Sequence, residues 1–358
     1  MVLDGAMALA PLPNHGYFTF SEADDTKENL ELLISYTGAP DGLAEKLALQ
    51  NNGGGAMASL LLQSLAVPET LVSSAPFNEI QALQIIVRIL GSISGDETGD
   101  SIVEPTRAGG QVAQALRSEA ITVAILDLLR RYRSAFLRDE EPWLRLEVLR
   151  SLRLLTYPSS TCWWVEDDIG YHRYADIRRR MVDVSVEALI DLKNTANPLP
   201  KVAALGCLKN LTTSCPACLK HLVQTPFAAE VVKLMTEQAK KSPPPVVDIF
   251  VGGCELLAST SVGPRSHLRK LSEAGAAEVA LLLLEQLHMH REVAASAFVL
   301  LGLVCKDEGC ASMVSSPTSR AVSAAAAVAK RWPLQVAQAA KAAKQDLAPQ
   351  LAALLPER

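Results

Sequence analysis

Hydrophobic and polar positions repeat with a long period in the second half of the chain. Three stretches share one pattern, and they begin at Lys201 (KVAALGCLKNL), Val246 (VVDIFVGGCEL) and Glu292 (EVAASAFVLLG). The second residues of these stretches lie 45 and 46 residues apart. In each stretch, small or apolar residues recur at helical spacing around most of the helix surface. The pattern therefore predicts helices that are buried between neighbouring units of a repeat, with Leu208, Leu211, Leu256 and Leu300 in the core between them.

Amphipathic stretches alternate with these buried ones, and their apolar residues recur at i, i+3 and i+4. They begin at Ser118, Arg179, Pro226 and Ser272. Two longer stretches, from Glu79 and from Trp143, match the buried pattern less closely. Gly-rich or polar segments at 95–110 and 159–174 interrupt the helical spacing. We expect an all-α chain without a β-sheet.

The segment from His267 to Val314 carries the clearest sequence of elements. It reads as a short helix, an EAGA turn at Glu273 to Ala276, a longer helix, a short loop and a long third helix. This order resembles an armadillo repeat that runs into the next one. The resemblance covers about residues 198–314 and, more loosely, 77–192. It implies a right-handed α-solenoid of armadillo-like (ARM/HEAT-type) repeats.

The two ends of the chain are less regular than the middle. We expect an extended N-terminal arm at residues 1–28, where prolines and an acidic SEADD run occur. The armadillo-like array is predicted at 29–316. An Ala-rich segment at 317–358 is divided by Pro333, Pro349 and Pro356, and it predicts short capping helices.

Composition narrows the classes of function. The 358 residues are 49% hydrophobic and 20% charged, with 5% aromatic residues and a formal net charge of -5. A general affinity for nucleic acid is disfavoured, because the chain has no overall positive charge. The longest uncharged apolar run, 293–305, is shorter than the roughly 20 residues of a membrane span. The N-terminus lacks the pattern of a signal peptide, and the cysteines favour a reducing, intracellular and cytoplasmic location.

One short motif suggests chemistry. Cys215 and Cys218 form a C-x-x-C, and His221 extends it to C-x-x-C-x-x-H. A thioredoxin-like site would need a preceding strand, whereas a helix is predicted before Cys215. A structural zinc site would need a fourth ligand. We interpret the motif as the seam between two helices, and we keep a thiol-redox or zinc-binding protein as an alternative.

No catalytic signature, such as G-x-S-x-G, H-E-x-x-H or a phosphate-binding G-K-[ST] loop, occurs in the sequence. The sequence favours a non-enzymatic scaffold or a structural subunit of a larger assembly that needs no cofactor. A chaperone co-factor is a further alternative, because some armadillo-like proteins embrace an ATPase domain. The expected partners are proteins in a hetero-complex.

The resemblance also implies where a partner binds. Third helices of armadillo-like arrays usually line a concave groove, and the nuclear-import members clamp an extended basic peptide there with a Trp and an Asn four residues apart. Asn210 matches the Asn, whereas Gly206 occupies the Trp position. The corresponding positions of the other predicted third helices are Arg88, Arg153, Glu255 and Gly302. Binding of a nuclear-import signal is therefore not expected.

The two arginines favour a different partner. A guanidinium group pairs well with carboxylates, so Arg88 and Arg153 favour an acidic segment of a partner, unless they pair with acids on their own helices. Trp163 and Trp164, in the polar loop, are candidate anchors for that segment or packing residues. Glu255 reverses the charge further along the groove. The expected partner-binding residues are Arg88, Arg153, Asn210, Glu255, Trp163 and Trp164.

Overall fold

The computed structural model describes the helical parts of the chain. The described residues are 55–65, 77–94, 115–132, 142–157, 174–191, 198–241, 246–261, 264–343 and 346–355. Within these ranges the regular secondary structure is entirely helical, which confirms the predicted all-α class. The expected arm at 1–28 and the two tryptophans of the polar loop, Trp163 and Trp164, lie outside them.

The chain forms two compact units, Met1–Met181 and Val182–Arg358, and the boundary falls within helix α10. In the first unit, α4 packs against α7 and α5 packs against α9. Polar contacts also hold this unit together: the Tyr132 hydroxyl at the end of α7 donates to Glu79 of α5 at 3.3 Å, and Ser151 of α9 donates to the Leu83 carbonyl of α5 at 3.4 Å. The helices of this unit, with α10, are α4 (Gly55–Leu65), α5 (Phe77–Ser94), α7 (Glu119–Arg131), α9 (Pro142–Leu155) and α10 (Ala175–Asp191).

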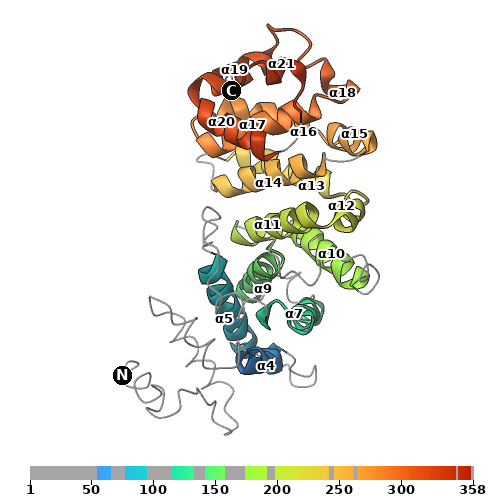
Figure 1. Ribbon diagram of the computed structural model, residues 1–358, viewed down its shortest axis with the longest axis vertical. Helices are drawn as coiled ribbons and strands as arrows, with labels where there is room; N and C mark the ends of the chain where they lie inside the picture. Colours follow the sequence, from blue (N-terminus) through green and yellow to red (C-terminus); the bar gives the residue numbers. More distant parts are fainter. Residues whose placement is uncertain are drawn as a thin grey trace, which may run out of the picture. The chain divides into compact units, whose positions relative to one another are not determined.

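The second unit contains the most regular repeats. It contains two complete three-helix repeats, each with a first, a second and a third helix: α12–α13–α14 and α15–α16–α17 (Figure 1). The helices of this part are α11 (Leu199–Ser214), α12 (Pro216–Leu222), α13 (Phe227–Ala239), α14 (Val247–Thr260), α15 (Arg265–Glu273), α16 (Ala276–Gln286), α17 (Arg291–Val304), α18 (Glu308–Ala311), α19 (Arg320–Arg331), α20 (Pro333–Ala342) and α21 (Pro349–Ala352).

Third helices pack against third helices, and second helices pack against second helices. α14 lies between α11 and α17, and α13 packs against α16. The C-terminal helices keep this order of neighbours, since α18 contacts α15, α19 contacts α16 and α20 contacts α17. α18, α19 and α20 are therefore arranged as one further, shorter three-helix repeat. The limits expected for the array and its cap stay a prediction.

The third helices contribute a large part of the core of the second unit, as their pattern predicts. The leucines expected between units are completely buried. They are Leu208 and Leu211 on α11, Leu256 on α14 and Leu300 on α17. Small residues let neighbouring helices come close: a Cβ atom added at Gly253 would lie 2.5 Å from the Met235 sulfur. A side chain at that position would force Met235 to move.

The predicted EAGA turn is confirmed between α15 and α16. Gly275 has φ 84°, in the left-handed region that residues with a Cβ rarely adopt. It begins α16, whose buried face includes Val279 and Leu283. A glycine at this position therefore sets the angle between a first and a second helix.

Candidate protein-interaction groove

A groove of about 900 Å³ runs along the third helices of the second unit. Its lining comes from α11, α14 and α17, with further residues from α12, α15 and α20. Each third helix presents one face to it. On α14, Glu255, Ala258 and Ser259 follow the i, i+3, i+4 spacing of a single helix face, while Leu256 is buried on another side.

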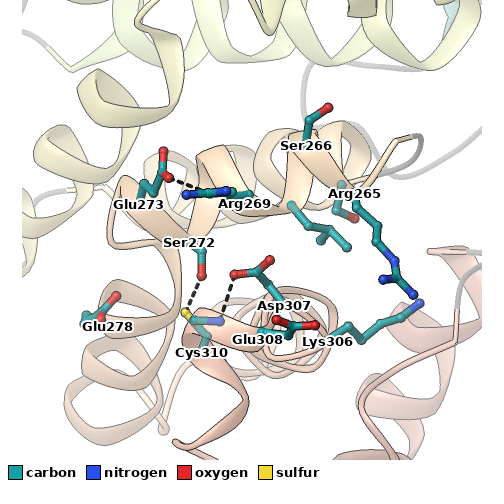
Figure 2. Close-up of a pocket in the computed structure, with 13 residues that line it drawn as sticks. Arg265, Ser266, Arg269, Ser272, Glu273, Glu278, Lys306, Asp307, Glu308 and Cys310 are labelled. Carbon is teal, nitrogen blue, oxygen red and sulfur yellow. Dashed lines mark hydrogen bonds and ion pairs between the residues drawn. The ribbon is translucent and has the colours of Figure 1, made fainter.

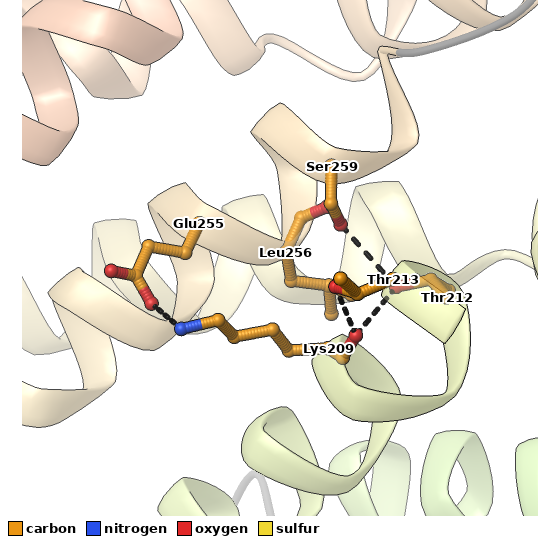
Figure 3. A network of polar contacts seen from close by, with 6 residues as sticks. All are labelled: Lys209, Thr212, Thr213, Glu255, Leu256 and Ser259. Atoms are coloured by element: carbon orange, nitrogen blue, oxygen red, sulfur yellow. Dashed lines mark hydrogen bonds and ion pairs between the residues drawn. The ribbon is translucent and has the colours of Figure 1, made fainter. Parts of the chain in front are cut away.

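An ion pair crosses from one repeat to the next within this groove. The Lys209 ammonium group of α11 pairs with the Glu255 carboxylate of α14 (Figure 3). The two side chains are 43% and 38% exposed, so solvent screens the attraction and such a pair contributes about 0.2–1 kcal/mol. The pair offsets the negative charge that Glu255 alone would give to this part of the groove.

Hydroxyl groups form a second link between the same helices. The Thr212 hydroxyl lies 3.3 Å from the Ser259 hydroxyl. Each hydroxyl also reaches a carbonyl of its own helix: Thr212 lies 2.9 Å from the Leu208 oxygen, and Ser259 donates to the Leu256 oxygen at 2.8 Å. Each hydroxyl carries one proton, so the hydrogen bond between the two hydroxyls forms only when one of them gives up the bond within its own helix. The remaining oxygen lone pairs can still accept hydrogen bonds. The groove can therefore accept N–H groups at this position.

Apolar side chains line another part of the groove. Val299 on α17 and Leu219 on α12 contribute to it, and α20 adds three alanines. The alanines are Ala339, Ala342 and Ala343. Such a combination of small apolar side chains and a few polar groups is typical of binding sites.

A second cavity, of about 1170 Å³, lies at the first helices α15 and α18 (Figure 2). Its lining is polar and carries both signs of charge. Arg269 pairs with Glu273 within α15 at 2.9 Å, and Asp307 accepts the Gly309 N–H at the start of α18. The sulfur of Cys310 lies 2.6 Å from the Ser272 hydroxyl oxygen, and burial raises the pKa of this thiol. A raised pKa keeps Cys310 protonated at neutral pH, where it is a poor nucleophile.

The structure places one of the expected contact residues in the lining of this groove. Glu255 lines it, whereas Asn210, half-buried on α11, is not among its lining residues. The ion pair with Lys209 was not expected from the sequence. The repeat period could have indicated this pair, because Lys209 and Glu255 are 46 residues apart and therefore occupy equivalent positions of neighbouring third helices.

The other expected contact residues belong to the first unit or lie outside the described ranges. Arg88 is part of α5, and Arg153 is half-buried on α9. Their role in binding stays a prediction, as does that of Trp163 and Trp164. The cavity-lining residues Thr212, Ser259 and Val299 were not among the expected contacts.

The C-x-x-C motif lies at a seam between two helices, as predicted. Cys215 ends α11 and precedes α12, where its sulfur accepts the Cys218 N–H at 3.4 Å. Both thiols are buried, and disulfide exchange needs an accessible thiolate. The third candidate ligand, His221, forms a 2.6 Å contact with Asp183 instead. In the described part of the chain, no group of three or more His, Cys, Asp or Glu side chains is placed to hold a metal ion.

Comparisons with known proteins support the fold. No family model and no curated protein sequence matches the chain. Solved structures do match: an engineered protein of the Northeast Structural Genomics Consortium has a TM-score of 0.52 at 16% identity, over 96% of this chain and 82% of that one. A designed armadillo repeat protein, YIII(Dq)4CqI, has a TM-score of 0.52 at 14% identity, over 80% of this chain and 96% of that one.

Another designed armadillo repeat protein was solved in complex with the peptide (KR)4. It has a TM-score of 0.51 at 14% identity, over 79% of this chain and 95% of that one. At these identities the likeness shows the fold, which is that of an armadillo-like helical repeat protein in the all-α solenoid class. Among the described residues, no helix combines the length and apolar character needed to cross a membrane.

Proposed function

We propose that the protein is a non-enzymatic interaction scaffold, or a structural subunit of a larger assembly, that binds an extended segment of a partner protein. The observation that carries the proposal is the groove along α11, α14 and α17. Armadillo-like repeats commonly act as protein-binding scaffolds, because stacked units create an extended binding surface. The buried cysteines of the C-x-x-C motif favour this function over thiol-redox chemistry.

The lining of the groove suggests the chemistry of the partner segment. Its alanines, Val299 and Leu219 fit apolar side chains of moderate size. Lys209 is paired with Glu255, whereas Lys220, also in the lining, has no carboxylate partner among the described residues. We propose an extended segment with apolar side chains and a carboxylate that reaches Lys220. This charge pattern is unlike that of the basic (KR)4 peptide in the designed complex.

For the first unit, the proposal is that Arg88 and Arg153 contact acidic side chains of a partner. Each guanidinium group offers a planar set of donors that suits a carboxylate. Asn210 would pair with the backbone of an extended segment through its amide group. Trp163 and Trp164 are proposed as anchors for the same class of segment.

A matched pair of substitutions tests whether the groove binds a partner. Ala258→Arg places a long charged side chain in the groove, whereas Ala326→Arg changes an alanine of similar, intermediate exposure on α19, outside the groove lining. We expect Ala258→Arg to reduce the recovery of co-purifying proteins at least about tenfold, and Ala326→Arg to leave it unchanged. Far-UV circular dichroism verifies that both variants are folded. Equal recovery with both variants would contradict binding in this groove.

A further inference from the structure

The C-terminal segment of the chain returns to the third helix α17. The Ala348 N–H donates to the Gly302 carbonyl at 2.7 Å. The Leu347 side chain covers Gly302 so closely that an added Cβ would lie 3.1 Å from the Cβ and Cδ2 of Leu347. Leu347, Ala348 and the following Leu351 are buried. A segment beyond the last long helix therefore packs directly on a third helix.

The hydrogen bond joins two groups that ordinary helix geometry leaves available. Gly302 is in the last turn of α17, and Lys306, whose amide would complete its helical bond, donates to Leu303 instead. Ala348 precedes Pro349 and has φ −53° and ψ 136°, because proline disfavours the helical region for the residue before it. The segment thus presents an extended backbone and one N–H to the end of a third helix, as a bound peptide would.

The contact continues a row of side chains that lines the groove. Ser296 and Val299 of α17 are in the lining, and Gly302 follows at the next i+3 position. Gly302 is also the position that the repeat pattern equates with Asn210 and Glu255. α20, which supplies three alanines to the lining, precedes the C-terminal segment in the sequence. The segment therefore lies at the α17 end of the groove.

We infer that residues 346–355 are an intramolecular ligand of the third-helix face at α17, and that they close the groove at this end. A partner segment that extends beyond α14 along this face would have to displace them. Gly302 recognises the segment, since it supplies both the space for Leu347 and the carbonyl for Ala348. The consequence for a partner rests on the proposed function, whereas the binding of the segment can be measured alone.

The test uses the chain's own C-terminal sequence as the probe. A fluorescein-labelled peptide of residues 344–358 (KQDLAPQLAALLPER) is titrated with full-length variants, and fluorescence anisotropy is measured. Leu347→Asp should release the intramolecular segment, and the peptide should then bind at least about tenfold more tightly than to the unmodified protein. Leu334→Asp, a matched change at an exposed leucine of α20, should leave peptide binding as weak as in the unmodified protein.

Two further variants show that the peptide binds at α17. Adding Gly302→Val to Leu347→Asp should abolish peptide binding, because the valine side chain fills the space that Leu347 occupies. Ala348→Pro is a second way to release the segment, for use if Leu347→Asp does not fold. It removes the N–H donor and keeps a compatible φ, so it should also increase peptide binding. Hydrogen exchange of the Ala348 amide should be slow in the unmodified protein and fast in Leu347→Asp.

Equal peptide affinity for the unmodified protein, for Leu347→Asp and for Ala348→Pro would overturn the inference. Fast exchange of the Ala348 amide in the unmodified protein would also overturn it. Failure of the proposed function is distinguishable, because it would appear as partner recovery that Ala258→Arg does not change. That result would leave the peptide titration unaffected.

Discussion

Third helices and first helices of the same repeats differ in how they use their side chains. The third helices α11, α14 and α17 have 14 to 16 residues, and each buries at least five hydrophobic residues. The first helices α12, α15 and α18 have 4 to 9 residues, and each buries one or two side chains. Charges follow the same division: Lys209 and Glu255 link two third helices, whereas Arg269 and Glu273 pair within one first helix.

The difference shows how a repeat protein can separate stability from recognition. Stacked third helices bury a continuous core on one side and line the groove on another. First helices bury little, so their polar cavity at α15 and α18 can change with small effect on stability. Four predictions test this contrast, from the largest expected effect to the smallest.

Removing a core leucine from a third helix should have the largest effect. Leu256→Ala leaves a cavity between α14 and its neighbours and should lower the free energy of unfolding by about 2–5 kcal/mol. The same change at the half-buried Leu268 on the first helix α15 should cost less than half as much. Urea denaturation followed by circular dichroism measures both. Equal losses would show that the first helices contribute as much to the core.

Two adjacent glycines of α14 should respond in opposite directions. An added Cβ would lie 2.5 Å from the Met235 sulfur at Gly253, but 3.5 Å from Leu205 at Gly252. Gly253→Ala should therefore destabilise the protein by about 1–3 kcal/mol through overpacking. Gly252→Ala should stabilise it by about 0.5–1 kcal/mol, because alanine favours the helix. Thermal unfolding of both variants decides the matter, and a stabilised Gly253→Ala would show that Met235 moves aside without cost.

The buried Lys201 of α11 should make stability depend on pH. Burial, with repulsion from Lys241, lowers the pKa of this amine below 10.5, and Glu237 partly opposes the shift. At a pH between the lowered pKa and 10.5, Lys201 is deprotonated in the folded state and still protonated in the unfolded state. The free energy of unfolding that Lys201 contributes therefore increases as the pH rises through this range. The stability of Lys201→Met relative to the unmodified protein should fall over the same range.

Urea denaturation from pH 7.5 to 10.5 measures that difference. Burial also raises the pKa of the Cys305 thiol from 9.0 to about 12, so this thiol lowers the stability of the protein as the pH rises above 9.0. Both proteins contain Cys305, so its effect cancels in the difference between them. A stability difference between Lys201→Met and the unmodified protein that stays constant over this pH range would contradict the assignment to Lys201.

The ion pairs should have the smallest effects. A double-mutant cycle with Lys209→Ala and Glu255→Ala should give a coupling of about 0.2–1 kcal/mol. Arg269 and Glu273 lie on one helix and are more exposed, and their double-mutant cycle should give a coupling energy of about 0.3–0.5 kcal/mol. Both couplings should decrease in high salt. A larger coupling for the pair within α15 would remove the distinction between links across repeats and contacts within a helix.

The sequence by itself determined the features that depend on contiguous residues. Helical periodicity predicted the third helices and the burial of Leu208, Leu256 and Leu300. The turn at Gly275 and the seam at Cys215 were also predicted, because glycine suits a left-handed turn and a proline follows the cysteine at the start of a helix. These signals are local and do not depend on how the repeats stack.

Only the tertiary structure decided which residues meet across repeats. The pairing of Lys209 with Glu255 depends on the rotation of α14 against α11, which the repeat period alone does not fix. The alanines of α20 became part of the groove because this helix packs on α17. The packing of Leu347 against Gly302 depends on where the chain places residues 346–355. Contacts of this kind arise from packing between distant segments, so local propensity and hydrophobic spacing carry little information about them.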